Sequence, residues 1–205
     1  MSRKTFATVD ISQAVRDIRK LHPEANDKIF AKALAFSIND SAATGKTAAK
    51  KEIRQKYKIR AKSINIQKSR ATTRNPVASI FTWGVPISMR EFKPRIVRNK
   101  GVSVNIAGDR KLLPHAFMPT MKSGHKNVFA RGHYTAGEGF KHRVGPGKPR
   151  TKKNKYNDLG ITKLVSVSQS VMFANPTVLD KVLSRIDTTF ERRIEYHIGR
   201  LIGGI

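Results

Sequence analysis

Cysteine is absent from this 205-residue chain, and acidic residues are scarce, with 14 Asp and Glu against 41 Lys and Arg. Without cysteine there is no disulfide framework, no thiol nucleophile and no cysteine-based metal site, which fits a reducing compartment. The first residues lack the apolar stretch of a signal peptide, and no run of about eighteen apolar residues occurs anywhere. We therefore expect a protein without a membrane segment that is made in the cytoplasm.

The scarcity of carboxylates also argues against an enzyme. The 14 acidic residues are scattered, so neither a paired general acid and base nor a Ser, His, Asp constellation is evident. Gly45-Lys46-Thr47 ends like a phosphate-binding loop, but Asp40 stands where that pattern needs glycine. His115, His125, His133 and His142 are surrounded by cations and are interpreted as polar loop residues. We expect no catalytic residues, no metal and no cofactor.

The positive charge is concentrated in the middle of the chain. Residues 1–45 carry seven bases and five acids, and residues 175–205 carry five and four. The bases outnumber the acids eleven to one in residues 46–74, seven to two in 75–121 and ten to one in 122–155, so these stretches contribute +24 of the net +27. Solubility alone needs a net charge of only about 2 to 8. This distribution favours an anionic partner, with nucleic acid as the first candidate.

Hydrophobic spacing predicts an α+β fold with a helix at each end of the chain. A short helix around Ile11 to Ile18 precedes a long Ala-rich helix from Glu24 to about Lys58, which becomes basic from Lys46 onward. A C-terminal amphipathic helix is predicted over residues 175–201. Its apolar positions are Val178, Val182, Ile186, Phe190, Ile194, Ile198 and Leu201.

The middle of the chain reads as a central antiparallel sheet with a long basic loop. β-type runs occur at 63–66, 78–83 and 101–106, with a further strand expected at about 116–121 across the turn at 107–109, and another at 161–167. Residues 122–158 contain six glycines, two prolines and ten bases, which predicts an extended Gly-rich loop or arm. This arm either stacks on nucleic acid or folds against a neighbouring subunit. We expect residues 1–205 to form a single domain.

The candidate contacts for DNA or an acidic partner are cations of these basic stretches. They are Lys46, Lys50, Lys51, Arg54, Lys56, Lys58, Arg60, Lys62, Lys68, Arg70, Arg95, Arg98, Lys141, Arg143, Lys148, Arg150, Lys152 and Lys153.

The arrangement resembles the minor tail protein Z family of tailed bacteriophages, the lambda-like tail completion proteins. The resemblance is carried by four segments: AKALAFSINDSAATGKTAAKKEI at 31–53, YKIRAKSINIQKSRAT at 57–72, GVSVNIAGDRKLLPHAFMPT at 101–120 and NPTVLDKVLSRIDTTFERRIEYHIGRL at 175–201. It implies a structural virion protein that completes the head-proximal end of the tail and contributes to head-tail joining and DNA-end positioning.

The resemblance also implies partners. These are other tail and neck proteins (tail terminator, tube and connector), together with non-specific DNA contact and no membrane. Because tails have rotational symmetry, we expect several copies in a ring, with a hexamer favoured. The alternative is a basic RNA- or DNA-binding protein of ribosomal or nucleoid type. No RNP-type aromatic strand, KH-type loop or zinc finger supports that alternative.

Overall fold

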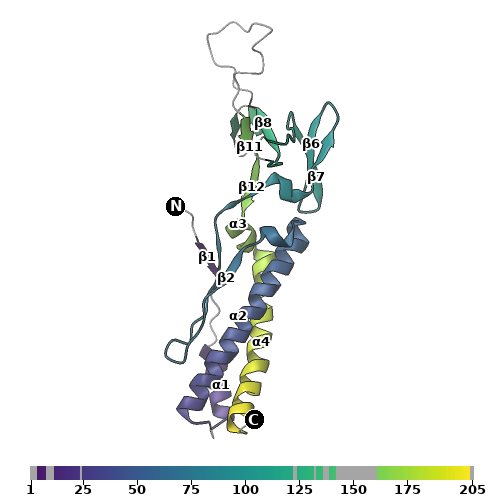
Figure 1. Cartoon of the computed structure of the whole chain (residues 1–205). Helices are drawn as coiled ribbons and strands as arrows, with labels where there is room; N and C mark the ends of the chain where they lie inside the picture. Colours follow the sequence, from purple (N-terminus) through teal and green to yellow (C-terminus); the bar gives the residue numbers. More distant parts are fainter. Residues whose placement is uncertain are drawn as a thin grey trace. The chain divides into compact units, whose positions relative to one another are not determined.

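The computed structural model describes residues 4–7, 12–23, 25–121, 124–131, 133–135, 139–141 and 161–203, and it confirms the α+β fold (Figure 1). Helices and strands alternate in blocks, with long helices near both ends and short strands between them. The helices are α1 (Ser12–Leu21), α2 (Asp27–Tyr57), α3 (Gln169–Phe173) and α4 (Pro176–Ile202), with 3-10 turns η1 (Ala61–Ser63) and η2 (Met89–Phe92). The strands are β1 (Lys4–Ala7), β2 (Ile66–Lys68), β3 (Ile80–Trp83), β4 (Pro86–Ser88), β5 (Arg95–Val97), β6 (Gly101–Ile106), β7 (Asp109–Pro114), β8 (Phe129–Arg131), β9 (His133–Thr135), β10 (Gly139–Lys141), β11 (Ile161–Lys163) and β12 (Val165–Ser168).

The chain divides into two compact units. The first unit, called the helical unit here, comprises residues 1–56, 64–85 and 168–205, and the second, the strand unit, comprises residues 57–63 and 86–167. The backbone passes between the two units four times. Because the units are interleaved in the sequence, this division does not decide whether they act as one domain, and the single domain stays a prediction.

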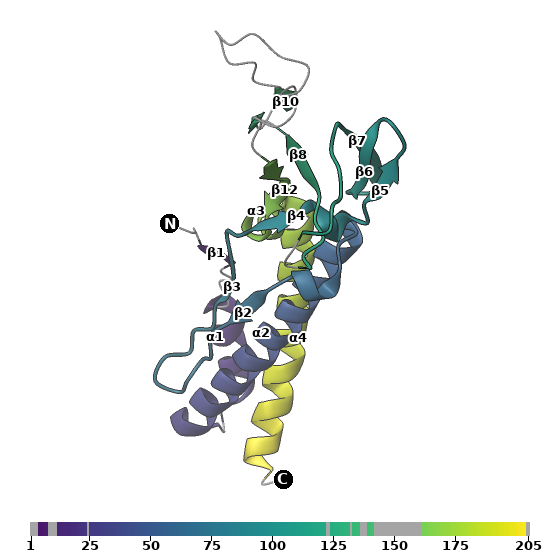
Figure 2. The ribbon, with the colours of Figure 1, turned by 45° about the horizontal axis from the view of Figure 1, so that its top comes forward.

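The helical unit is built around an antiparallel pair of long helices, α2 and α4 (Figures 1 and 2). Contacts between the two helices recur along their length. They are Asp40 with His197 at 3.1 Å, Gly45 beside Ile186, Glu52 with Lys181 at 3.0 Å, and Lys56 with Asn175. As the residue number increases along α2, the number of the contacting residue decreases along α4. The two helices are therefore antiparallel and keep one register over their whole contact.

The two helices fit because their buried lines have complementary sizes. Both lines repeat every fourth residue, and both are buried. The line on α2 is Ala33, Ser37, Ser41, Gly45, Ala49, Ile53 and Tyr57, and the line on α4 is Val178, Val182, Ile186, Phe190, Ile194 and Ile198. The register set by Gly45 and Ile186 places small residues of α2 opposite the bulky residues in the second half of α4. Small residues let helices approach closely, and burial of the facing apolar side chains then stabilises the pair.

A second set of contacts closes the core of the helical unit around α1 and the segment before β3. One buried cluster unites Ile18 of α1, Phe30 of α2 and Phe190 of α4 with Ala71. The side chain of Asn39 holds the backbone of Ala71, because its Nδ2 donates to the Ala71 oxygen at 2.9 Å and its Oδ1 accepts from the Ala71 nitrogen at 2.9 Å. The three-stranded sheet of this unit has the order β1-β3-β2, with both pairs antiparallel.

The strand unit contains the antiparallel sheet β5-β6-β7, visible in Figure 2. Val102 and Val104 of β6 are fully buried, while Ser103, Asn105 and Ile106 are partly exposed. Ala107 and Gly108 join β6 to β7, with φ of 57° and 102°. Positive φ at both central residues is the signature of the tight type I′ hairpin turn.

The predicted β-type run at 63–66 is wrong for most of its length, because the 3-10 turn η1 ends at Ser63 and β2 begins only at Ile66. The strands depart from the sequence predictions in three further places. The partner of β6 is β7, and the predicted partner at 116–121 is wrong, because a two-residue turn places the next strand directly after it. The predicted strand at 161–167 is interrupted at Leu164, and in the described residues the strands divide among five small sheets. The predicted loop 122–158 contains three short strands: β8 pairs with β11, which follows the loop, and β9 pairs with β10. Residues 142–158 lie outside the described residues.

Candidate polyanion-binding surfaces

Three of the predicted cations of α2 form a row next to the row of buried residues that packs against α4. Lys46, Lys50 and Arg54 each follow a buried residue directly, so their line lies about 100° around the helix from the face that packs. Lys58, the next member of the repeat, adopts φ of 55° immediately after the helix ends. The buried residues of α2 and its cations therefore both recur every fourth residue, so the two rows run side by side along the helix.

Most cations in this half of α2 have no acidic partner. Within the described part of the chain, Lys46, Lys50, Lys51 and Arg54 form no ion pair with a carboxylate. The stretch contains one acid, Glu52, and it is bonded to Lys181 of α4 at 3.0 Å. Since no carboxylate of the described residues neutralises these charges, they are available to an anionic ligand.

Two cations on α4 belong to a second surface, on the other side of the packed face of α2 from Lys46, Lys50 and Arg54, and the sequence analysis missed both of them. Lys181 and Arg185 line a groove between α2 and α4 together with Lys51, and the groove has a volume of about 620 Å³. Residues 175–205 are nearly neutral as a whole, which hid these two positions. A helical reading would have found them, because they lie one turn apart on one face.

The other predicted cations of the helical unit take separate positions. Lys56 donates from its Nζ to Asn175 Oδ1, so it joins α2 to the start of α4. Lys68 lies in β2, exposed, and its Nζ donates to the backbone oxygen of Asn39 at 3.3 Å. Arg70 follows β2 and is exposed. Lys68 and Arg70 therefore come from a different element from the cation line of α2.

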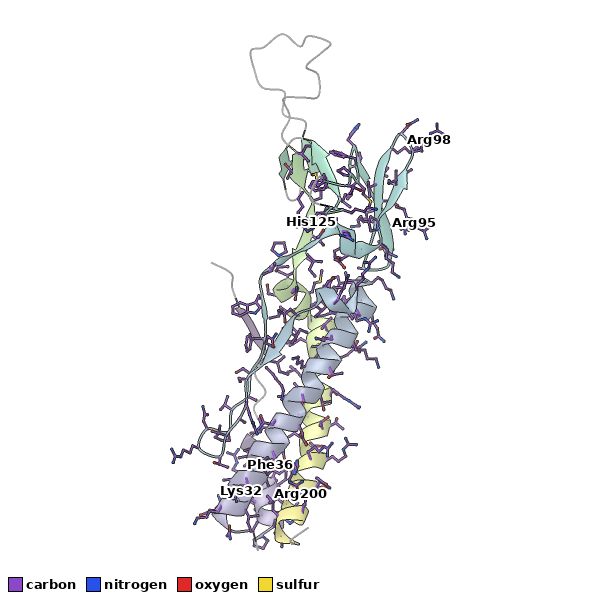
Figure 3. All side chains as sticks on the ribbon, in the orientation of Figure 1. Lys32, Phe36, Arg95, Arg98, His125 and Arg200 are labelled. Carbon is purple, nitrogen blue, oxygen red and sulfur yellow. The ribbon has the colours of Figure 1, made fainter. Side chains whose placement is uncertain are left out.

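In the strand unit, the predicted Arg95 and Arg98 are exposed on β5 and the turn after it (Figure 3). Lys58, Arg60 and Lys62 belong to the short segment that this unit takes from the end of α2 and from η1, and they are also exposed. Arg110 of β7 is a neighbouring cation that the predictions omitted, and its guanidinium donates to Ser103 Oγ at 2.8 Å.

The remaining candidates lie at the edge of the described residues or beyond it. Lys141 belongs to β10. The other five, Arg143, Lys148, Arg150, Lys152 and Lys153, lie outside the described residues. Their assignment to an anion-binding arm stays a prediction.

Aromatic and cationic side chains meet at the far end of α4. The Arg200 guanidinium lies over the ring of Phe36 at 5.9 Å from its centroid, and Figure 3 shows Lys32 on the same end of the helix pair. His197 is buried and contacts Asp40, and its ring lies tilted against that of Phe36, with the two ring centroids 5.6 Å apart. The packing of these rings and the links from α4 to α2 give the histidine and carboxylate a structural role.

Metal-binding and membrane-spanning features are absent from the residues that the structure describes. No group of three or more His, Asp or Glu side chains there has the arrangement of a metal site. No helix formed by those residues is long and apolar enough to cross a bilayer. What these residues do offer chemically is unneutralised positive charge on ordered elements.

Comparison with protein-family models, with curated protein sequences and with solved structures gives no match for this chain. The case for a function therefore rests on its residues and on their geometry.

Proposed function

We propose that this protein is a structural virion protein of a tailed phage, which completes the head-proximal end of the tail and contributes to head-tail joining and DNA-end positioning. The observation that carries the proposal is that packing and charge share one rigid helix. One line of α2 packs against α4, while the adjacent line presents cations that no described carboxylate neutralises. A protein that joins other subunits beside DNA needs both properties in one element.

The segments that resemble the tail completion family support the proposal because they coincide with ordered elements. Segment 31–53 lies within α2, and segment 175–201 covers nearly all of α4. Segment 101–120 contains the β6–β7 hairpin. Three of the four segments therefore lie on the helix pair and the hairpin, and the fourth, 57–72, contains η1 and β2.

The proposed assembly is a ring of copies around the tail axis, with a hexamer favoured. It would contact the tail terminator, the tube and the connector, and its location would be the head-proximal end of the tail. A ring needs two different surfaces on each subunit, because each copy presents one to the copy before it and another to the copy after it.

Immunogold localisation tests this proposal. An antibody to the chain is applied to a gradient-fractionated lysate of the source, and the gold is located on the particles that sediment with the protein. We expect gold next to the head at one end of tail-like particles, and no gold after the antibody is pre-absorbed with purified chain. Gold on ribosomes or bulk nucleic acid, with none on tails, would refute the virion role and support the basic nucleic-acid-binding alternative.

A further inference from the structure

The groove between α2 and α4 combines the features of a site for a linear polyanion. On α2, Thr44, Thr47 and Lys51 recur at helical spacing along the groove, and Ala48 lies among them. On α4, Lys181 and Arg185 face them from the opposite side. Residues at this spacing point from the same side of each helix, so the groove follows the direction of the helix pair.

The charge of the groove is positive and its geometry is held in place. Where the structure describes its lining, three cations face one acid, Glu52. The Glu52 side chain is only 17% exposed, and it bonds the Lys181 ammonium at 3.0 Å, whereas the Lys181 side chain is 59% exposed. Glu52 therefore fixes Lys181 at the groove and leaves most of that side chain accessible to a ligand.

We infer that this groove binds the phosphodiester backbone of nucleic acid, without reading its sequence. The inference deepens the proposed function, on which it rests, by naming the ligand of one surface and by adding Lys181 and Arg185 to it. An Arg guanidinium binds phosphate oxygens through two parallel hydrogen bonds, and Lys acts as a point charge. The described residues of the lining include no aromatic side chain, although protein interfaces are enriched in aromatic residues at their centres.

The spacing of the cations also suits a phosphate chain. Lys181 and Arg185 are four residues apart on α4, which corresponds to about 6 Å along the helix axis. Phosphates of one strand of duplex DNA are about 3.4 Å apart along its axis. The pair therefore spans about two phosphate steps, and Lys51 contributes a third cation from the opposite wall.

The test compares two triple variants of the full chain that remove the same charge. The groove variant is K51Q/K181Q/R185Q, and the control is K28Q/K32Q/R192Q, whose residues are exposed on α2 and α4 of the same unit but do not line the groove. Glutamine keeps a hydrogen-bonding group opposite Glu52. Affinity for a short fluorescent duplex of arbitrary sequence is measured by anisotropy over a series of salt concentrations, and circular dichroism establishes that both variants are folded.

We expect the groove variant to bind at least about tenfold more weakly than the control at physiological salt. Its slope of log affinity against log salt should be shallower than that of the unmodified chain by about 2 to 3, since each lost phosphate contact contributes about 0.9. Equal losses in the two variants would overturn the inference, because overall charge would then explain binding. The same titration is made with fluorescent polyglutamate. Unchanged affinity of the groove variant for the duplex, whether or not its affinity for polyglutamate falls, would overturn the inference as well. None of these results bears on where the gold label lies, so the two proposals fail separately.

Discussion

The close approach of α2 to α4 at Gly45 gives a sharp test of the helix register. A Cβ built on Gly45 lies 2.7 Å from Ile186 Cδ1, 2.7 Å from Ile186 Cγ1 and 2.7 Å from Ile80 Cδ1. Gly45→Ala therefore forces at least two side chains to shift. Overpacking of this kind typically costs about 1 to 3 kcal/mol, whereas replacing glycine by alanine inside a helix gains about 0.8 to 1 kcal/mol.

We expect G45A to lower the free energy of unfolding by about 1 kcal/mol, because the overpacking cost exceeds the gain in helix propensity. For a chain of this length, that corresponds to a decrease of about 2 to 4 °C in Tm. The measurement is urea unfolding followed by the far-ultraviolet circular dichroism of the helices. A matched control is G199A in α4, since nothing lies within 4 Å of a Cβ built there.

The control isolates the packing term. G199A is expected to stabilise the protein by up to about 1 kcal/mol, because it gains helix propensity without a clash. In an I186A background, which itself costs about 2 to 5 kcal/mol, the methyl group that G45A adds loses one of its two obstructing neighbours. G45A should then be more favourable by at least about 1 kcal/mol than in the unmodified chain. If G45A and G199A stabilise equally, Gly45 does not face Ile186 and the register is wrong.

Two further predictions concern the links that hold the helical unit together. N39A should lower the free energy of unfolding by about 1 to 3 kcal/mol and speed hydrogen exchange at the Ala71 amide, since it removes both bonds to the Ala71 backbone. The aspartate of N39D can still accept from that amide, so the amide should exchange more slowly in N39D than in N39A. Equal exchange in the two variants would contradict the assignment. A double-mutant cycle of E52Q and K181Q should give a coupling of about 0.5 to 1 kcal/mol that falls as salt is added, because Lys181 is largely exposed; no coupling at low salt would exclude the ion pair in solution.

The C-terminal helix was predictable because its buried residues are also its most apolar ones. All six residues of the repeat from Val178 to Ile198 are buried. Branched and aromatic side chains at a regular spacing give a clear periodic signal in a single sequence. The helix begins at Pro176 and ends at Ile202, within about one residue of the predicted bounds.

The buried line of α2 was harder to predict, because small and polar residues form much of it. Phe36 is large and apolar, yet it is 37% exposed, whereas the polar Ser37 and Ser41 are buried. Each of these serines donates its hydroxyl to the carbonyl four residues earlier, Ser37 at 2.7 Å and Ser41 at 2.8 Å, so burial leaves no hydroxyl unsatisfied. Hydropathy does not identify this row of residues, because most of them are buried for their small size and not for their apolar character.

The strand β7 was missed for a related reason. Its sequence, DRKLLP, is charged at one end and closes with proline, so it lacks the apolar alternation of a half-buried strand. Most of its residues are exposed, because only β6 of this hairpin has a fully buried pair of side chains. The turn at Ala107 and Gly108 determines where β7 begins, and turn geometry was the better signal.

The groove cations show why charge counted over long segments is a weak guide to a site. Residues 175–205 appear neutral because their acids and bases nearly balance. The faces of a helix, however, are separate surfaces, and Lys181 and Arg185 share one face with no acid of α4 among the groove residues. Recognising Lys181 and Arg185 as groove residues requires knowing how α2 packs, since the groove exists only where α2 lies alongside α4.

The same repeat of four residues links packing to charge on α2, and this constrains how the protein meets an anion. A cation in a flexible tail loses conformational freedom on binding, and that cost reduces affinity. Lys46, Lys50 and Arg54 instead follow Gly45, Ala49 and Ile53, whose burial against the rest of the unit fixes the direction of the helix face. Binding energy is then available from charges that are already aligned. Because the packing repeat sets that alignment, a change that rotated α2 against α4 would move these three cations and the core together.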